Sequence, residues 1–149
     1  MSDSSKYSAP SLIGRPIQDF VELNRVWEEL EKEKYILQLG PHEELPQEEL
    51  EKGFLACIQE GSLACKMNNG GSQHVLLAIM VTNDLVGLES LFGHKPRQIE
   101  YYSREATRLN LFSMSRVRKM MSMSAQLVEF FLEVQSFQLR ELASHLQVV

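Results

Sequence analysis

Two cysteines, Cys57 and Cys65, are the residues whose type and spacing most readily suggest chemistry. They lie in the apolar runs GFLACIQ (53–59) and SLACKM (62–67), which meet at the turn sequence QEGS. A hairpin with a three-residue turn would place the two thiols opposite each other, whereas a two-residue turn would place Cys57 opposite Ala64. The first register predicts a thiol redox switch. The alternative, which we favour, is a pair of small buried apolar side chains.

A recognisable catalytic or metal-binding arrangement is missing from the sequence. No Ser/His/Asp or Cys/His set occurs within a local motif, and no glycine-rich loop leads into a helix. The histidines are scattered without ligand spacing: His42, His74, His94 and His145. An enzyme on a cupin-like barrel would need several histidines in strands, and only His74 lies in a predicted strand. We therefore predict a protein that is not an enzyme and holds no metal.

Composition and charge restrict the function further. The chain has 149 residues, which suits one domain with an appended helix, and its formal net charge is −5. A nucleic-acid-binding module would normally present a basic face, so any DNA must be bound by another part of the protein. No apolar run is long enough to cross a membrane, and the polar start MSDSSKYSAPS lacks a signal peptide core, which predicts a cytoplasmic protein.

The periodicity of apolar residues divides the chain into parts. Residues 1–14 are serine-rich and predict a disordered terminus, and Arg15–Lys34 shows the spacing of an amphipathic helix. From there to residue 114 the apolar runs are short and broken by Gly, Pro and Asn, which is typical of strands and turns. The predicted strands are residues 35–39, 53–59, 62–67, 73–81, 97–103 and 108–114. The spacing predicts a small antiparallel barrel or jelly roll over residues 15–114.

Residues 115–149 return to a helical period, which predicts a short helix followed by a long one. A heptad seam runs along the long helix, and we expect it to join two copies of the chain in a homodimer. Its residues are Val128, Leu132, Gln135, Leu139, Leu142, Leu146 and Val149. A second apolar strip lies beside it: Leu127, Phe130, Phe131, Val134 and Phe137. The alternative is one broad face that packs only on the barrel of its own chain.

The order helix, antiparallel barrel, short helix and long helix resembles the sensor half of the Crp/Fnr family of bacterial transcription regulators. The stretch FLACIQEGSLACKM (54–67) is similar to a hairpin of that family, with Gly61 and Ser62 at the turn. The stretch NNGGSQHVLLAIMVTNDLVGLESLF (68–92) resembles the next hairpin and the family's Gly-Asp-x-x-Gly motif. Asp84 and Gly87 match that motif, and Asn83 replaces its usual glycine. The stretch EATRLNLFSMSRVRKMM (105–121) resembles the last barrel strand and the following helix.

The resemblance implies a cyclic-nucleotide-binding-like β-roll with an effector pocket. In members that bind cyclic nucleotides, a glutamate after the second glycine holds the ribose, and an Arg-Ser/Thr-Ala triplet holds the phosphate. Here the glutamate position is Leu88, and PRQIE (96–100) replaces the triplet, so the sequence argues against a cyclic nucleotide. Glu89 is displaced by one residue and would reach inward only if the local backbone shifted. The candidate pocket residues are Gly87, Leu88, Glu89, Arg97, Gln98, Leu127 and Phe131.

Other cofactors of the family also lack their ligands in this sequence. An iron–sulfur cluster needs four cysteines and the chain has two, while the scattered histidines argue against haem. The cofactor and the signal stay unknown, and a small-molecule effector is compatible with the pattern.

The resemblance implies an effector-sensing and dimerisation domain of a Crp/Fnr-like transcription regulator. The winged helix-turn-helix that binds DNA is expected after Val149, because the chain ends inside its heptad pattern without a stop signal. The alternative is a stand-alone ligand-binding or protein-interaction β-roll without DNA binding.

Overall fold

A computed structural model describes residues 11–12, 15–16, 20–68, 74–92 and 99–145. Its centre is a β-roll of two antiparallel sheets. The first sheet has the order β3 (Tyr35–Leu39), β9 (Thr107–Phe112), β4 (Leu55–Glu60) and β7 (Leu85–Val86). The second sheet has the order β6 (His74–Val81), β5 (Ser62–Asn68) and β8 (Ile99–Ser103). All six predicted strands are confirmed, with bounds within two residues of those predicted.

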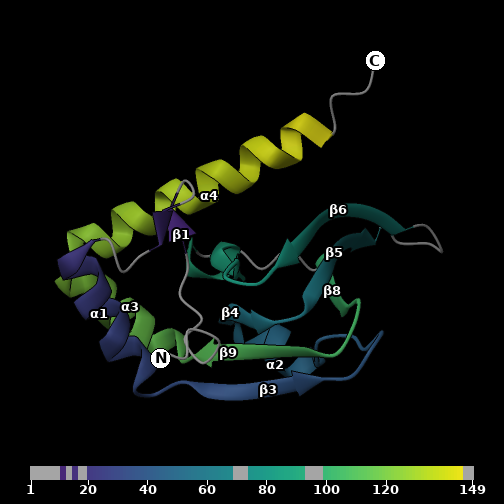
Figure 1. The fold of residues 1–149 in the computed structure, drawn as a ribbon, viewed down its shortest axis with the longest axis horizontal. Coiled ribbons are helices and arrows are strands. Elements are labelled where there is room, and N and C mark those ends of the chain that lie inside the picture. The colour runs from purple at the N-terminus through teal and green to yellow at the C-terminus, as the bar shows by residue number, and fades with distance from the viewer. Residues whose placement is uncertain (1–10, 13–14, 17–19, 69–73, 93–98, 146–149) are drawn as a thin grey trace, which may run out of the picture.

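Three helices gather at one end of the roll: α1 (Val21–Glu31), α3 (Met114–Met123) and the first half of α4 (Ala125–His145) (Figure 1). The rest of α4 passes over the roll on the side of β6. Shorter elements complete the described chain: β1 (Ser11–Leu12), β2 (Arg15–Pro16), α2 (Gln47–Lys52) and the 3₁₀ helix η3 (Leu88–Phe92). Among the described residues, no helix is long and apolar enough to cross a membrane.

Strand β4 shows how the sequence builds two cores. Successive strand side chains point to opposite faces. Ala56 and Ile58 join the cluster between the two sheets, and Leu55 and Cys57 join the cluster between the first sheet and the helices. All four are fully buried, which explains why the run LACI is apolar throughout instead of alternating.

The helix-side core contains most of the buried aromatic side chains. Trp27 is fully buried and packs edge-on against Phe112, with ring centroids 5.0 Å apart. Phe130 and Phe131 from α4 join the same cluster. The second apolar strip of the long helix is therefore confirmed as an intramolecular packing face for four of its residues: Leu127, Phe130, Phe131 and Val134. Phe137 is 49% exposed instead.

The predicted hairpin between residues 53 and 67 is wrong. Strand β4 pairs with β9 and β7, and β5 pairs with β6 and β8, so the chain crosses from one sheet to the other at Gly61. Gly61 has a φ of +98°, and a Cβ there would lie 2.6 Å from the carbonyl oxygen of Ala106. The crossing is fixed by the Thr107 hydroxyl, which accepts from the Ser62 amide at 3.2 Å and donates to the Ser62 carbonyl at 3.1 Å.

The first helix is shorter than the predicted Arg15–Lys34. It begins at Val21, because Phe20 has an extended backbone and Arg15–Pro16 pairs with Ser11–Leu12 in a short antiparallel ladder. That ladder also gives Ser11–Leu12 regular structure inside the predicted disordered terminus; residues 1–10 and 13–14 lie outside the described part of the chain. The β5–β6 hairpin pairs Asn68 with His74, as expected around NNGG, although residues 69–73 are outside the description.

Candidate effector site

A tight turn at Asn83 begins the candidate site. Asn83 has the left-handed φ of 76° that the sequence predicted. The Asp84 carboxylate accepts a hydrogen bond from the Val81 amide at 2.7 Å, and the Asp84 amide donates to the Val81 carbonyl at 2.9 Å. The pKa of Asp84 is raised, because the effect of burial is larger than the opposing effect of the hydrogen bond from the Val81 amide. The carboxylate therefore closes the turn.

The turn is attached to strand β4 on its other side. The Asn83 amide donates to the Ile58 carbonyl at 2.8 Å, and the Ile58 amide donates to the Asp84 carbonyl at 3.1 Å. These bonds hold β7 against β4. From this fixed edge, Leu85 points to the helix-side core and Val86 to the core between the sheets.

Gly87 lets the chain pass close to strand β4. Its φ is +93°, and a Cβ at this position would collide with the carbonyl oxygen of Phe54 and lie 3.0 Å from the Phe54 ring. Only glycine combines this backbone conformation with such a close approach. The glycine that resembles the second glycine of the family motif therefore has a structural role.

After Gly87 the 3₁₀ helix η3 turns two neighbouring side chains in different directions. Leu88 is 2% exposed and belongs to the helix-side core, together with Leu127 and Phe131 of α4. Glu89 points toward the other sheet, where its Oε1 accepts a 2.6 Å hydrogen bond from the Tyr101 hydroxyl of β8. The tight helix supplies the backbone shift that Glu89 needed to reach inward.

Tyr101 is a buried polar residue that the sequence analysis did not identify. It is 4% exposed, and its ring contacts Phe54 edge-on at 5.7 Å between centroids. Burial and the Glu89 carboxylate raise the pKa of Tyr101 well above its usual value. Its partner across the ladder is Cys65 of β5, which contributes a third polar group to the same place.

The two cysteines do not face each other. Cys57 lies in the helix-side core and Cys65 in the core between the sheets, on strands that are not paired, and neither is in a disulfide. The expected cross-strand register of the redox hypothesis is therefore wrong, because β4 and β5 belong to different sheets. Burial raises the pKa of Cys65 to about 11, with a further contribution from the Glu89 carboxylate, which makes it a poorly reactive thiol at neutral pH.

The structure describes five of the seven predicted pocket residues, and these five lie in two different places. Leu88, Leu127 and Phe131 come together in the helix-side core. Gly87 lies against Phe54 at the edge of the roll, and Glu89 projects into the roll. Arg97 and Gln98 lie outside the described residues. The 87–89 segment thus joins the interior of the roll to helix α4.

A second buried polar residue, Asn110, lies on the helix side of the first sheet. It is fully buried and is the ladder partner of Cys57. Its neighbours Leu109 and Leu111 point between the sheets, so its own side chain points toward the helices. Neither its amide nitrogen nor its amide oxygen has a hydrogen-bond partner within the described part of the chain. Nothing in the sequence distinguished this asparagine from one at a turn.

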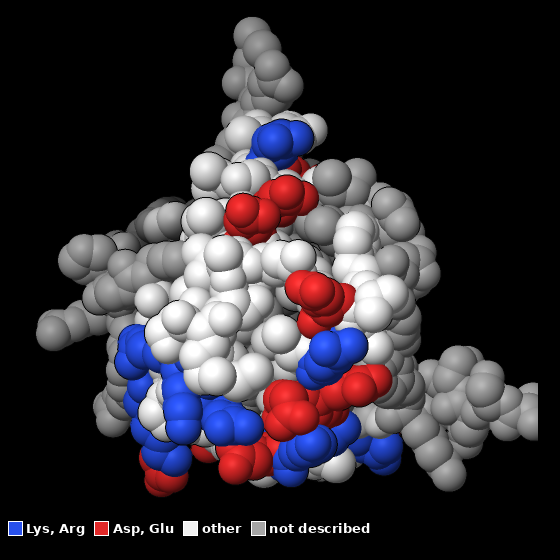
Figure 2. All heavy atoms as spheres, turned by 90° about the vertical axis from the view of Figure 1, so that its left-hand side faces the viewer, with Lys and Arg blue, Asp and Glu red and all other residues white. Residues whose placement is uncertain are grey.

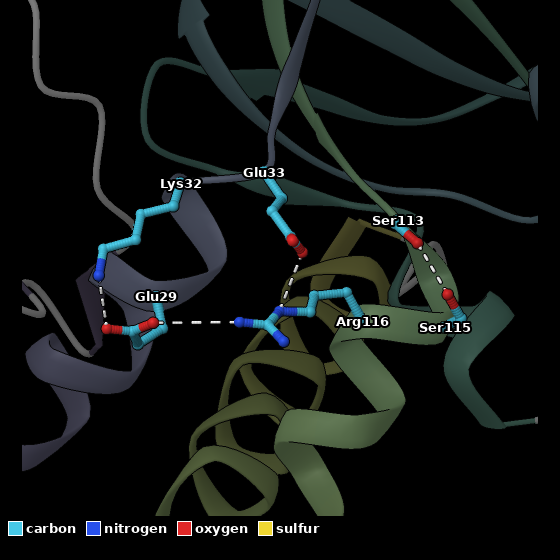
Figure 3. A network of polar contacts seen from close by, with 6 residues as sticks. All are labelled: Glu29, Lys32, Glu33, Ser113, Ser115 and Arg116. Atoms are coloured by element: carbon cyan, nitrogen blue, oxygen red, sulfur yellow. Dashed lines mark hydrogen bonds and ion pairs between the residues drawn. The ribbon is translucent and has the colours of Figure 1, made fainter.

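Polar contacts fasten the helices around the site. The Gln138 side chain of α4 donates to the Leu85 carbonyl of β7 at 2.9 Å, which ties the long helix directly to the candidate site. Figure 3 shows where Arg116 of α3 meets the chain just after α1: its Nε lies 3.1 Å from a Glu33 carboxylate oxygen without hydrogen-bond alignment. The Lys32 ammonium, at the end of α1, donates to the Glu29 carboxylate of α1 at 2.8 Å and lowers the pKa of Glu29. These ion pairs are partly exposed to solvent, so we expect them to contribute little to stability.

The predicted dimer seam lies on a face of α4 that the roll leaves uncovered. Leu132 and Leu139 are 48% and 65% exposed. The other described seam residues are half-buried: Val128, Gln135 and Leu142. Leu146 and Val149 are outside the described residues. Strand β6, which contacts α4, also exposes large apolar side chains: Val75, Leu76, Ile79 and Val81.

The described histidines and acidic residues form no metal site. Among residues 20–68, 74–92 and 99–145, no group of three His, Cys, Asp or Glu side chains is placed to hold a metal ion. His74 lies 3.2 Å from a carboxylate oxygen of Glu100 on the second sheet, and His42 has a positive φ of 60° in a loop.

Comparison by sequence gives no relative: no family model and no curated protein matches the chain. Comparison by structure finds several solved proteins with a similar fold. The N-terminal domain of a transcriptional regulator from Streptomyces coelicolor has 17% identity and a TM-score of 0.61, covering 92% of this chain and 95% of that one. The sensor domain of the transcriptional regulator DNR from Pseudomonas aeruginosa has 11% identity and a TM-score of 0.65, covering 89% of both chains.

A longer protein matches in the same way. The c-di-GMP-responsive global regulator CLP from Xanthomonas campestris has 17% identity and a TM-score of 0.67, and the match covers 81% of this chain but 61% of that one. The chain therefore spans less than two thirds of this regulator. The β-roll with its flanking helices and long C-terminal helix is the fold of the N-terminal sensor domains of Crp/Fnr-type transcription regulators, as the sequence motifs predicted.

Proposed function

We propose that this chain is the effector-sensing and dimerisation domain of a Crp/Fnr-like transcription regulator. The single observation that carries the proposal is the position of residues 87–89. This segment places Glu89 against Tyr101 inside the roll and Leu88 against α4. One short helix, η3, therefore contacts both the interior of the roll and α4. The fold shared with sensor domains of transcriptional regulators supports this reading.

In the proposed mechanism, a signal in the roll changes the packing of η3 against α4. An effector that competes for Glu89 or Tyr101 would break their hydrogen bond and let η3 move. Because Leu88 packs in one cluster with Leu127 and Phe131, such a movement requires α4 to repack. The Gln138 bond to Leu85 would transmit the same change further along α4. Two packings of α4, each favoured by a different state of the roll, would form the switch.

The proposed dimer forms through the exposed seam of α4. Leu132 and Leu139 lie seven residues apart and are exposed on one face, the arrangement by which two helices interlock in a coiled coil. The apolar side chains of β6 beside α4 would extend the interface onto the roll. A DNA-binding domain joined to the chain would then be presented twice, as recognition of two half-sites requires.

Sedimentation equilibrium tests the dimer. We expect twice the chain mass of 17.1 kDa for the wild type and the single mass for Leu139→Glu, because a buried charge at the seam is not paired. Ser144→Glu adds the same charge at an exposed position of α4 outside the seam and should leave the dimer intact. A monomeric wild type at concentrations of about 100 µM would refute this part of the proposal.

Amide hydrogen exchange tests the coupling between roll and helix separately. Tyr101→Phe removes the hydroxyl that holds Glu89, and we expect faster exchange in α4 as well as in η3. Tyr102→Phe is the matched control, because no hydrogen bond from the Tyr102 hydroxyl occurs within the described part of the chain. Faster exchange in η3 alone would contradict the coupling without affecting the dimer.

A further inference from the structure

A groove between α1 and the beginning of α4 belongs neither to the candidate effector site nor to the seam. Its volume is about 440 Å³. The floor is apolar: Leu23 and Phe130 are 5% and 2% exposed, and Phe20 forms a half-buried wall. Val21, at the edge of the groove, is 73% exposed, which is unusually open for a large apolar side chain beside buried ones.

The rim of the groove is acidic. Glu22 lies on α1, and Glu129 and Glu133 lie on α4. The last two are four residues apart, so they project from neighbouring turns of one helix face. Among the described residues, no lysine or arginine pairs with any of the three. Figure 2 looks onto this end of the molecule and shows an uncharged surface bordered by acidic side chains on some sides and by basic side chains on others.

The groove stays open in the proposed dimer. At 100° per residue, Leu139 of the seam is rotated by about 140° from Gln126, which lines the groove. Phe137, by contrast, lies seven residues after Phe130 and so projects from nearly the same face as that floor residue. It is 49% exposed and continues the apolar strip beyond the groove. A second copy of the chain bound at the seam therefore leaves the Gln126 side of the groove uncovered, whereas Glu129, about 60° from Leu132 of the seam, lies nearer to the second copy.

We propose that the groove docks a short basic amphipathic segment of a partner protein. Large apolar side chains of that segment would lie on Leu23 and Phe130, in the way that a helix lays its apolar face into a groove. Lysines or arginines spaced four residues apart would face Glu129 and Glu133, and another would face Glu22. These three carboxylates, which have no cationic partner within the described part of the chain, surround an apolar floor and argue for a cationic partner and against an acidic or nucleic-acid one.

Fluorescence anisotropy of the full chain with a labelled model peptide tests the charge requirement. The probes are the helical peptide acetyl-(LKKLLKL)₂-amide and its counterpart with glutamate at each lysine position. We expect the basic peptide alone to bind. Glu129→Gln/Glu133→Gln should weaken its binding about tenfold, since it removes two of the three carboxylates that would pair with the peptide. The matched control Glu48→Gln/Glu141→Gln removes the same two charges from exposed positions outside the groove, and should leave binding unchanged.

The apolar requirement is tested with Val21→Ser. This residue is 73% exposed, so the substitution should leave the fold intact, and it removes an apolar side chain from the edge of the groove without changing the charge, so it should weaken the peptide binding. Equal binding of the acidic peptide, or an equal loss in the control pair, would overturn the proposal. A change in the sedimentation of Val21→Ser without any peptide would also overturn it, because the groove would then be an interface with a second copy.

Discussion

Removal of a single hydroxyl, in Tyr101→Phe, should destabilise the chain measurably. The substitution keeps the aromatic ring and its edge contact with Phe54, but removes the donor that lies 2.6 Å from Glu89. A hydrogen bond to a charged group contributes about 1.5–3 kcal/mol, and leaving a partly buried carboxylate without its donor adds desolvation. Because Glu89 is half-buried, we expect a loss of about 2 kcal/mol in the free energy of unfolding. For a chain of this size that loss corresponds to a lower Tm by roughly 4–8 °C.

Urea unfolding followed by the fluorescence of Trp27 measures this loss. Trp27 is the only tryptophan of the chain and is fully buried, so its emission reports the loss of the helix-side core. Tyr102→Phe removes a hydroxyl from the next residue of the same strand and should cost less than about 0.5 kcal/mol. Combining Tyr101→Phe with Glu89→Ala in a double-mutant cycle should give a coupling energy of about 1–2 kcal/mol. Equal stability of the two tyrosine variants, or a coupling near zero, would refute the reasoning.

Three further substitutions test other parts of the structure. Gly87→Ala should lower the free energy of unfolding by at least about 2 kcal/mol in the same urea assay, because φ is positive and the new Cβ collides with Phe54; wild-type stability would show that this backbone relaxes freely. Asn110→Leu should raise the free energy of unfolding by about 1–2 kcal/mol, because it removes two unpaired polar atoms from a fully buried position; a loss of stability would mean that the amide has a partner in solution. Cys65 keeps its proton in the folded state up to about pH 11, whereas its usual pKa is 9.0, so the folded state binds more protons between these values and stability should fall as the pH rises from about 9 to 11. Under reducing conditions Cys65→Ala should show a smaller fall over that range, and an unchanged slope would contradict the shifted pKa.

The strands were predictable because their signal is local. Apolar runs bounded by Gly, Pro and Asn identified six strands, and the positive φ of Asn83 followed from its place in a turn. The pairing of β4 and β5 was not predictable, because the turn sequence QEGS suits a hairpin and a crossing between sheets equally well. The crossing between the sheets is determined by the approach of Ala106 and Thr107 to Gly61, which are more than forty positions apart in the sequence.

The candidate site was predictable only in part. The motif around Asp84 and Gly87 located the segment, since both residues are needed for its turn and its close approach to β4. The opposite directions of Leu88 and Glu89 depend on the tight 3₁₀ helix. This helix could not be predicted, because its five residues show no periodic pattern in the sequence. Tyr101 and Asn110 lie in strands where their neighbours are apolar or polar in no regular order, so only the folded chain reveals that they are buried.

Disulfide trapping tests most directly the claim that α4 uses one face for its own roll and the other for a second copy. Leu139→Cys places a thiol on the exposed seam, and Glu133→Cys places one on the groove side of the same helix. The native Cys57 and Cys65 are buried in both variants. Under mild oxidation we predict a covalent dimer for Leu139→Cys and none for Glu133→Cys. Equal cross-linking of the two variants, or none in either at concentrations of about 100 µM, would contradict the account.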